Sequence, residues 1–488
     1  MRMALGHLAD GIVDPLPPEL AAGTISGLTA DSRAVHPGYV FAALAGTEID
    51  GSRFIPDALA RGAVAVLAGR HAVPMEIPVP VIVADNPRRA LALMAARFYA
   101  VQPNIAVAVT GTNGKTSVAA FVRQIWERMG FGAASIGTVG VVSPSGKRAL
   151  AHTTPDPVHL HAVLAELAEE GVTHVALEAS SHGLAQARLD GVRLAAGAFT
   201  NLTRDHLDYH STFEDYAAAK LRLFTEVLDP TATAVINADT DAAAEFVAAA
   251  RDRGLIVHTV GVSGDDLRLL RQTRDGLGQQ LRIGIGNAVY EVYLPLAGAF
   301  QASNAVIAAA LVIGAGGDQA LAIRALESLK GASGRLELVA ATADGAPVFV
   351  DYAHTPDALE TVLATLKPYA GGRLKVVFGC GGDRDRGKRP EMGAIAARLA
   401  DEIYVTDDNP RGESPAAIRA AILAACPGAI EIGDRAEAIF AAIAGLKSGD
   451  VLVVAGKGHE TGQIVGKEVL PFSDQEVVKA AVEGRPKP

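Results

Sequence analysis

Short apolar runs of strand length recur along the chain and alternate with alanine-rich segments of helical length. In the middle of the chain, the apolar runs lie at residues 105–109, 172–177, 197–200, 234–237 and 255–260. Strands that alternate with helices in this way form a parallel sheet covered by helices. The pattern therefore predicts an α/β domain with a parallel sheet over residues 101–332.

The alternation begins again after the glycine-rich segment 331–334. Further apolar runs lie at residues 348–350, 374–378, 402–406 and 451–455. Residues 1–100 instead mix short strand-like runs with Gly and Pro turns, which is typical of a small α/β unit. With 488 residues the chain is too long for a single core. We predict an α/β protein of three domains, namely 1–100, 101–332 and 333–488.

A polar loop follows each strand that we predict for the C-terminal sheet. The loops span residues 351–354, 379–385, 407–412 and 456–460, and each contains charged side chains. In open α/β sheets, ligands bind outside the carboxyl ends of the strands. We therefore expect these loops to form one site.

The segment from Thr110 to Ser117 directly follows the first of the apolar runs and reads Thr-Gly-Thr-Asn-Gly-Lys-Thr-Ser. A strand that leads through glycines to Lys and a hydroxyl residue at a helix start presents backbone N–H groups and an ammonium to a polyphosphate. We predict that a nucleoside triphosphate binds here, through the residues Gly111, Thr112, Asn113, Gly114, Lys115, Thr116 and Ser117. Lys115 would contact the terminal phosphates, and the Thr116 hydroxyl would bind Mg²⁺.

The spacing of this loop differs from the standard phosphate loop. Only Thr112 and Asn113 separate Gly111 from Gly114, where the standard motif has four residues. An ordinary glycine-rich turn between a strand and a helix is therefore the alternative.

Carboxylate and imidazole groups follow two predicted strands of the central domain. Glu178 opens the segment Glu-Ala-Ser-Ser-His-Gly, and His206 lies within residues 203–208. Because Mg²⁺ prefers oxygen ligands, we predict Glu178 as a ligand, whereas His206 is either a second ligand or a structural loop residue. Lys220 lies in the helical stretch 213–226, and the residues alone favour a solvated helix lysine.

Composition narrows the possible partners. The formal net charge is −10, from 44 basic and 54 acidic residues, without a block of like charges. This balance indicates neither nucleic acid nor a membrane as partner, and we expect a small-molecule substrate. The chain has two cysteines, Cys380 and Cys426, and no apolar run long enough to span a bilayer. These features favour a soluble, cytoplasmic protein.

Five motifs taken together resemble those of the Mur ligase family. They are Thr-Gly-Thr-Asn-Gly-Lys-Thr, Glu-Ala-Ser-Ser-His-Gly-Leu, Thr-Asn-Leu-Thr-Arg-Asp-His-Leu-Asp-Tyr-His, Asp-Tyr-Ala-His-Thr-Pro-Asp and Gly-Lys-Gly-His-Glu. They occur in the family's order over nearly the whole chain. The resemblance implies a UDP-substrate-binding N-terminal domain, a central ATP-binding domain with the phosphate loop, and a Rossmann-like C-terminal domain.

The resemblance also implies an ATP-dependent ligase that works through an acyl phosphate. The implied reaction adds meso-diaminopimelate to UDP-N-acetylmuramoyl-L-alanyl-D-glutamate, a step of peptidoglycan precursor synthesis that serves cell-wall growth and division. Mg²⁺ is the implied cofactor and ATP the co-substrate, and we expect a monomer. The alternatives are a lysine-adding Mur ligase, a ligase like folylpolyglutamate synthase, and a non-catalytic ATP-binding regulator.

Matching the family's motifs residue by residue implies further roles. The implied catalytic residues are Lys115, His206, Lys220 and His354. The implied metal ligands are Thr116, Glu178, His206 and Lys220, the last as a carbamate (N6-carboxylysine). The implied ATP contacts include Asn304, Arg335 and Asp351. The UDP-muramoyl dipeptide would contact Ser32, Thr47, Glu48, Ile49, Thr153, Thr154, Ser180, Gln186 and Arg188. The diaminopimelate pocket would contain Arg384, Asp408, Asn409, Pro410, Arg411, Gly456 and Glu460.

One loop of the family marks the amino acid that is added. Residues 407–411 read Asp-Asp-Asn-Pro-Arg, which resembles the form associated with meso-diaminopimelate, whereas the lysine-adding type lacks the arginine. The guanidinium of Arg411 can pair with the carboxylate that diaminopimelate has and lysine lacks. Because loss of one partner from a buried charged pair costs about 3–5 kcal/mol, we expect lysine to be rejected. Glu460 would face an ammonium group, and His354 is a candidate base for the amine.

Overall fold

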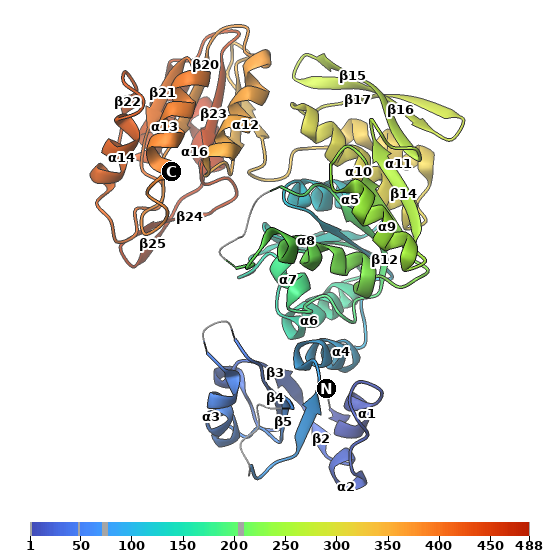
Figure 1. The fold of residues 1–488 in the computed structure, drawn as a ribbon. Coiled ribbons are helices and arrows are strands. Elements are labelled where there is room, and N and C mark those ends of the chain that lie inside the picture. Colours follow the sequence, from blue (N-terminus) through green and yellow to red (C-terminus); the bar gives the residue numbers. More distant parts are fainter. Residues whose placement is uncertain (1, 47–48, 71–76, 204–208, 488) are drawn as a thin grey trace. The chain divides into compact units, whose positions relative to one another are not determined.

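A computed structural model describes residues 2–46, 49–70, 77–203 and 209–487 of the chain. Figure 1 shows the fold of the chain, which divides into two compact units. Unit 1 comprises Met1–Arg268 and Val306–Ala325, and unit 2 comprises Leu269–Ala305 and Leu326–Pro488. The division into three domains at the boundaries given above remains a prediction.

The N-terminal part of unit 1 is a parallel sheet in the order β3-β4-β5-β6 (Figure 1). Its strands are β3 (Gly27–Thr29), β4 (Tyr39–Ala43), β5 (Ala65–Gly69) and β6 (Val81–Ala84). Around it lie α1 (Leu5–Ala9), α2 (Pro18–Ala21), α3 (Ile55–Ala60), α4 (Pro87–Tyr99) and the pair β1 (Met3–Ala4) and β2 (Thr24–Ile25). Because strand residues alternate between faces, Val40 packs in the cluster that includes α4, while Phe41 packs in the cluster that includes α3.

The larger sheet of unit 1 has the order β10-β9-β8-β11-β7-β12-β13-β14, and β14 pairs with the first residues of β15. The strands that pair in parallel are β7 (Ile105–Thr110), β8 (Ala133–Gly137), β11 (His174–Glu178), β12 (Leu194–Phe199), β13 (Thr233–Asn237) and β14 (Ile256–Gly261). The antiparallel additions are β9 (Gly140–Ser143) and β10 (Gly146–Arg148). The helices are α5 (Lys115–Arg128), α6 (Pro157–Glu169), α7 (Ser181–Ala185), α8 (Phe213–Arg222) and α9 (Ala243–Asp252). The predicted parallel sheet is confirmed for these strands.

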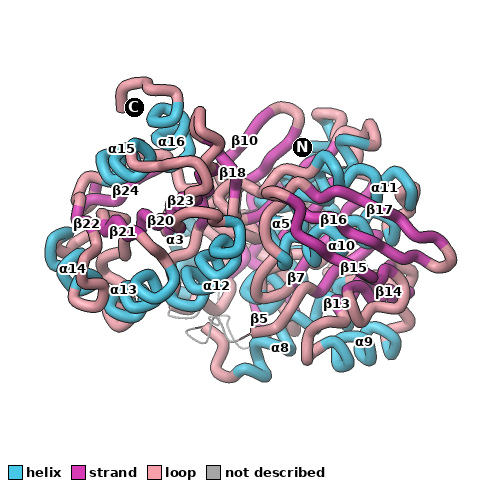
Figure 2. Tube along the Cα trace, turned by 90° about the horizontal axis from the view of Figure 1, so that it is seen from above, coloured by secondary structure: helices cyan, strands magenta, loops and turns pink. Residues whose placement is uncertain are grey.

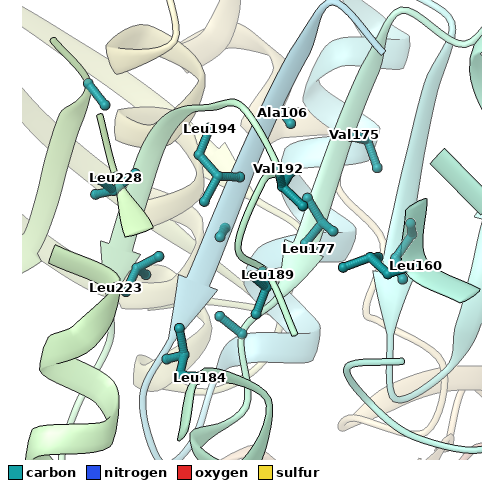
Figure 3. Packing of buried hydrophobic residues seen from close by; sticks show 14 of the residues in the cluster. Ala106, Leu160, Val175, Leu177, Leu184, Leu189, Val192, Leu194, Leu223 and Leu228 are labelled. Atoms are coloured by element: carbon teal, nitrogen blue, oxygen red, sulfur yellow. The ribbon is translucent and has the colours of Figure 1, made fainter. Parts of the chain in front are cut away.

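One face of this sheet packs into a buried apolar cluster. Figure 3 shows leucines from different elements that meet in one buried cluster, among them Leu160 of α6, Leu177 of β11 and Leu223 after α8. Leu177 is 1% exposed, and its neighbour Glu178 must therefore leave the strand on the opposite side. Because Glu178 is also the last residue of β11, it lies at the carboxyl edge of the sheet.

Unit 2 begins with an antiparallel meander that the sequence reading missed. Its strands are β15 (Leu267–Asp275), β16 (Gly278–Ile285) and β17 (Ala288–Leu294), which run side by side in Figure 2. Gly276 and Gly286, with φ of 58° and 55°, form the tight turns. In β16, Leu281 and Ile283 are buried and Arg282 between them is exposed. This alternation and the Asp-Gly and Gly-Asn pairs were the available signal for hairpins.

The chain passes from one unit to the other within β15 and within α10 (Ala299–Gly314), and α11 (Gln319–Ala325) ends the second segment of unit 1. The main sheet of unit 2 has the order β18-β19-β23-β20-β21-β22, with only the first pair antiparallel. Its strands are β18 (Glu337–Ala341), β19 (Pro347–Asp351), β20 (Leu374–Phe378), β21 (Glu402–Val405), β22 (Ile430–Glu431) and β23 (Val451–Ala455). The second predicted α/β sheet is therefore confirmed.

Helices cover both faces of this sheet. One face packs against α12 (Pro356–Leu366), α13 (Lys388–Leu399) and α14 (Pro415–Leu423), and the other packs against α15 (Arg435–Ala444) and α16 (Asp474–Val482). A hairpin of β24 (Gly462–Val465) and β25 (Glu468–Pro471) follows β23. Within the described ranges, no helix is both long enough and apolar enough to cross a membrane.

Candidate functional site

The predicted phosphate loop joins β7 to α5 in unit 1. Gly111 and Gly114 have φ of 144° and 89°, which glycine adopts without strain. A Cβ on Gly111 would lie 1.9 Å from Thr200 Oγ1, so a side chain does not fit there. Thr200 Oγ1 donates to Asn113 O at 2.6 Å, and the Asn113 amide donates to Asn201 Oδ1 at 2.9 Å. The residues that follow β12 thus hold the loop in place through these contacts, and the loop leads directly into the start of α5.

Two lysine side chains meet at the carbonyl oxygen of Gly111. Lys115 Nζ and Lys220 Nζ each donate to this oxygen at 2.8 Å. Lys220 is 1% exposed, and its Nζ lies 4.2 Å from the centroid of the Tyr216 ring. The interpretation of Lys220 as a solvated helix lysine is therefore wrong. The apolar Ala and Leu positions of α8 did not reveal that its lysine faces the phosphate loop.

Glu178 is the hub of the polar network beside this loop. Its Oε2 accepts from Thr116 Oγ1 at 3.0 Å and from Thr138 Oγ1 at 3.1 Å, and its Oε1 accepts from the Thr138 amide at 2.8 Å. A Cβ on Gly137 would lie 2.0 Å from Oε1, so this glycine makes room for the carboxylate. Glu178 at the end of β11 and Thr116 on α5, both predicted as metal ligands, are therefore direct neighbours.

The residues predicted to hold the muramoyl dipeptide form a connected group next to Glu178. Thr154 Oγ1 donates to Glu178 O at 2.8 Å and lies 3.0 Å from Ser180 Oγ. Arg188 donates through Nη1 to Thr154 O at 2.6 Å and through Nη2 to Gln186 Oε1 at 2.7 Å. Burial lowers the pKa of Arg188, although a guanidinium stays charged at any physiological pH. Thr153 joins the group through its hydroxyl, 3.0 Å from Thr138 Oγ1.

The other predicted substrate contacts are less fully placed. Ser32 is buried in a turn whose preceding residue, Asp31, accepts a hydrogen bond from the Arg33 amide at 2.9 Å. Ile49 is exposed. No hydrogen bond within the described ranges joins Ser32 or Ile49 to the group around Arg188. Thr47, Glu48 and His206 lie outside the described residues, so their predicted roles remain predictions.

Unit 2 contains the remaining predicted ATP contacts. Asn304 on α10 is connected to Arg335 through Gln301, which accepts from Asn304 Nδ2 at 3.5 Å and donates to Arg335 O at 3.4 Å. Asp351, at the end of β19, accepts from the amides of Leu336 at 2.6 Å and Ala353 at 2.7 Å. Burial raises the pKa of Asp351, while Arg335 and the two amides favour its charged form.

The polar loops of the unit 2 sheet converge as predicted. Asn409 Nδ2 donates to Glu460 Oε2 at 3.0 Å, and Gly382 N donates to Asn409 O at 2.9 Å. Gly456 N donates to Asp351 O at 3.1 Å. These bonds link the end of β19 with the loops after β20, β21 and β23. A Cβ on Gly456 would lie 2.6 Å from Asp408 Oδ2, which explains a glycine at this position.

Arg411 is held in an unusual backbone conformation at this site. Its φ is 49°, and that of Asp383 in the neighbouring loop is 54°; such values cost a residue with a side chain about 1–3 kcal/mol and cluster at functional sites. Arg411 Nη1 donates to Gly382 O at 3.0 Å. Its backbone pairs with β24, through Arg411 N to Ile464 O at 3.1 Å and Gly466 N to Arg411 O at 2.9 Å. Arg384, also predicted for this pocket, is exposed.

Two imidazoles lie beside the pocket. His354 Nδ1 is 2.9 Å from Tyr352 O, and desolvation by the surrounding chain, with Lys388 and Arg335 nearby, lowers its pKa although part of the ring is exposed. Burial lowers the pKa of His459 to about 4. Both rings are therefore neutral at neutral pH, and His354 can accept a proton there.

The sequence reading missed several residues of these sites. Lys457, within the quoted motif Gly-Lys-Gly-His-Glu, is fully buried and donates to Glu460 Oε2 at 2.9 Å. Thr138 binds Glu178, and Gln463 donates to Asp408 O at 2.7 Å. Thr138 and Gln463 stand in no recognisable motif. For Lys457 the motif itself was the available signal.

The oxygens around Thr116 suit a hard cation. Mg²⁺ takes carboxylate and hydroxyl oxygens together with waters and phosphate oxygens, and the Thr116 hydroxyl and Glu178 carboxylate provide two adjacent oxygens. Within the described part of the chain, no group of three or more His, Cys, Asp or Glu residues could hold a metal by itself. The donor set therefore fits an ion that also binds phosphate oxygens.

The two sites define an α/β protein with a phosphate loop in one unit and a Rossmann-like sheet with converging charged loops in the other. The Mur ligase catalytic-domain profile matches residues 24–99, the Mur ligase middle-domain profile matches 109–312, and the Mur ligase glutamate-ligase-domain profile matches 334–458. The chain belongs to the Mur ligase family. The predicted class, α/β with the three-domain architecture of this family, is confirmed.

Known relatives cover nearly the whole chain. It is 59% identical over 461 residues to the UDP-N-acetylmuramoyl-L-alanyl-D-glutamate--2,6-diaminopimelate ligase of Mesorhizobium japonicum, covering 94% of this chain and 95% of that protein. A solved structure of a ligase with the same name is 33% identical, with a TM-score of 0.74 and coverage of 99% of both chains. A folylpolyglutamate synthase of Mycobacterium tuberculosis complexed with ADP shares the fold at 20% identity, with a TM-score of 0.60, over 76% of this chain and 91% of the other.

Proposed function

We propose that this protein is an ATP-dependent, ADP-forming ligase that adds meso-diaminopimelate to UDP-N-acetylmuramoyl-L-alanyl-D-glutamate in peptidoglycan precursor synthesis. The observation that carries the proposal is the group of charged loops in unit 2, where the guanidinium of Arg411 and the carboxylate of Glu460 are linked by hydrogen bonds through Asn409. A guanidinium suits a carboxylate, and a carboxylate suits an ammonium. The names of the relatives support the same substrates.

The reaction requires activation of a carboxylate, because a free carboxylate is a poor electrophile. An oxygen of the D-glutamyl γ-carboxylate attacks the γ-phosphorus of ATP, the bond to the bridging oxygen breaks, and ADP leaves. The neutral amine of diaminopimelate then attacks the acyl phosphate carbon. Phosphate leaves with the electron pair of the broken C–O bond, and the amine loses a proton to give the amide. Charge develops on the phosphoryl oxygens in both steps, where fixed cationic and N–H donors are most effective.

On the ATP side, the proposal assigns the triphosphate to the loop of Gly111 and the start of α5. Lys115, which now donates to Gly111 O and Thr112 O at 2.8 Å, would turn to the terminal phosphates. Thr116 and Glu178 would hold Mg²⁺, which when bound neutralises phosphate charge. Asn304, Arg335 and Asp351 of unit 2 are assigned to ATP as well.

Lys220 is assigned as a carbamate. Its amine and that of Lys115 share the Gly111 oxygen as acceptor, and two ammonium groups this close repel each other. Addition of carbon dioxide to the neutral amine removes this repulsion. It also supplies anionic oxygens that Mg²⁺ accepts.

On the amino-acid side, the proposal assigns the distal carboxylate of diaminopimelate to Arg411 and Arg384, and an ammonium to Glu460 and Asp408. Asn409, Pro410 and Gly456 would line the binding site of the amino acid. His354, neutral at neutral pH, is assigned as the base that takes the amine proton.

A lysine-adding Mur ligase and a folylpolyglutamate synthase-like ligase are the nearest alternatives. Lysine would leave the guanidinium of Arg411 without its carboxylate, which disfavours the first. The likeness to the folylpolyglutamate synthase covers 76% of this chain, which leaves room for a domain that binds a uridine nucleotide. We place the enzyme in the cytoplasm as a monomer; its cysteines, Cys380 and Cys426, are free thiols and buried.

The test is a competition assay with product identification. The purified protein is incubated with UDP-muramoyl dipeptide, ATP, Mg²⁺ and an equimolar mixture of lysine and the diaminopimelate isomers, and the products are analysed by mass spectrometry after separation. We expect the meso-diaminopimelate adduct with equimolar ADP and phosphate. A lysine adduct as main product would overturn the substrate assignment, and ATP hydrolysis without an adduct would favour the non-catalytic regulator.

A further inference from the structure

The amino-acid pocket of unit 2 contains a lysine that the reaction as described does not use. Lys457 follows β23 directly and is 0% exposed. Its Nζ donates to Glu460 Oε2 at 2.9 Å and to Asn409 Oδ1 at 3.0 Å. One ammonium thus joins two loops that lie far apart in the sequence.

The two oxygens that accept hydrogen bonds from Lys457 each accept a second hydrogen bond from another group. Asn409 Oδ1 also accepts from the Ile464 amide at 2.9 Å, and Asn409 Nδ2 donates to Glu460 Oε2 at 3.0 Å. Glu460 Oε2 therefore receives two donors. Among the residues that the structure describes, none donates to Glu460 Oε1, and the Glu460 side chain is 33% exposed. The carboxylate is therefore held through Oε2, while Oε1 is left to accept a hydrogen bond from a ligand.

The same lysine also acts on the loop that carries Arg411. Asn409 stands two residues before Arg411, and both are tied to β24, Asn409 through its side chain and Arg411 through its backbone. The left-handed φ of Arg411 needs such support from its surroundings. Lys457 therefore holds both the carboxylate of Glu460 and the loop backbone that carries the side chain of Arg411.

We propose that Lys457 is a positioning residue for the incoming amino acid: by clamping Glu460 Oε2 and Asn409 Oδ1, it orients Glu460 Oε1 toward an ammonium of the substrate and fixes the loop of Arg411. This inference rests on the proposed function, because the ammonium and carboxylate are those of a diamino acid with two carboxylates.

A second consequence concerns pH. Burial acts to raise the pKa of Glu460, but Lys457, the Asn409 amide and His459 outweigh it and hold the pKa below its usual value. Among the described residues, Tyr352 and Arg435 also interact electrostatically with this carboxylate. Removal of the Lys457 charge therefore raises the pKa of Glu460, and the acid limb of kcat/KM for diaminopimelate moves to higher pH.

The chain offers a matched control in Lys375. This lysine is also 0% exposed, and its Nζ donates to Glu402 Oε1 at 2.9 Å and to Gly445 O at 2.7 Å. It belongs to β20 of the same sheet but lies near the beginning of that strand, whereas Lys457 follows the end of β23. Lys375→Met and Lys457→Met therefore remove comparable buried ion pairs at opposite edges of the sheet.

The test compares steady-state kinetics of the full-length enzyme with Lys457→Met and Lys375→Met. For Lys457→Met we expect a KM for diaminopimelate raised about 10- to 100-fold, the worth of a hydrogen bond to a charged group, with KM for ATP unchanged. We also expect its acid limb to shift upward. For Lys375→Met we expect a lower melting temperature with both KM values and the pH profile unchanged. Equal effects of the two variants on KM, or an unshifted acid limb, would overturn the proposal.

A double-mutant cycle keeps the test decisive if Lys457→Met does not fold because Glu460 is left unpaired. The variant Lys457→Met/Glu460→Gln removes both charges and is compared with Glu460→Gln alone. If Lys457 acts through Glu460, its loss adds less than about threefold to KM in this background. A further rise in KM of about tenfold or more in the Glu460→Gln background would show an independent structural role and refute the inference. Failure of the wild-type enzyme to form the adduct would instead refute the proposed function.

Discussion

The two sites of this protein are constructed in different ways. The phosphate loop is one contiguous segment, whose shape depends on backbone conformation and on glycines such as Gly111, where a side chain would meet Thr200 at 1.9 Å. The site of unit 2 is not formed by one contiguous segment. Its charged groups come from the loops after four strands and are joined by side-chain hydrogen bonds such as that from Asn409 to Glu460. The first site needs the right local backbone. The second site needs the correct pairing of the strands in the whole sheet, because this pairing brings the four loops together.

This difference predicts separate responses to mutation, of which the largest is expected at Lys115. Loss of its ammonium removes a fixed donor from the developing phosphoryl charge, so Lys115→Ala should lower kcat about 10²- to 10³-fold. The measurement is single-turnover ADP formation at saturating substrates. Arg123→Ala, on the same helix and paired with Glu127 at 2.5 Å, is the control and should keep the wild-type rate. A Lys115→Ala enzyme with normal turnover would remove the phosphate assignment.

A comparable effect, expressed in a different constant, is expected at Arg411. Arg411→Ala removes one of the two guanidinium groups assigned to the distal carboxylate of diaminopimelate and should reduce kcat/KM for diaminopimelate about 10²- to 10³-fold. The rate with lysine, which has no such carboxylate, should change little. Side-by-side assays with the two amino acids measure the ratio. Full discrimination by the variant would show that another group selects the substrate.

A smaller effect, of about 10²-fold in kcat, is expected for His354→Ala if the imidazole is the base. Its pKa is lowered, so the neutral, proton-accepting form prevails at neutral pH and is lost only as the pH falls through that lowered pKa. The wild-type rate should therefore decline on the acid side below the ordinary pKa of histidine. The variant should lack this limb, which a pH–rate profile at saturating diaminopimelate detects. An unchanged profile would mean that the amine loses its proton elsewhere.

The smallest effect, about tenfold in KM for diaminopimelate, is expected for Gly456→Ala. Its φ of 114° disfavours a side chain, and the new Cβ would lie 2.6 Å from Asp408 Oδ2. The carboxylate must then move within the pocket, while the phosphate loop is unaffected. Steady-state titrations of both substrates separate the two constants. An equal rise in KM for ATP would show that the substitution disturbs more than the pocket.

The same contrast explains what the sequence could and could not predict. Glu178 ends β11, and Thr116 stands in the first turn of α5, which follows β7. The parallel strands β7 and β11 end along one edge of the sheet, where the structure joins the two side chains at 3.0 Å. The burial of Lys220 was not predictable from α8, because its helical periodicity does not say which neighbour covers that face. Thr138 was missed because its contact with Glu178 depends on how β9 turns back onto β8.

The unit 2 pocket shows the same limit on a larger scale. The positions of the four loops after the strands predict that they lie together. They do not predict which side chains of the loops form hydrogen bonds with each other. Lys457 looked like one more polar loop residue, and only the packing around it shows a fully buried ammonium between two loops. The apolar residues after position 267 do not by themselves distinguish the meander β15 to β17 from further strands of a helix-covered parallel sheet, although Gly276 and Gly286 mark its turns.

The most direct test of the central claim, that triphosphate and amino acid are recognised by separately constructed sites, is a crossed kinetic measurement. KM for ATP and KM for meso-diaminopimelate are determined for wild-type enzyme, Lys115→Arg and Arg411→Lys, since both substitutions keep the charge and change its geometry. We predict that the first variant alters only the constant for ATP and the second only the constant for diaminopimelate. A change of both constants by either variant would contradict the account.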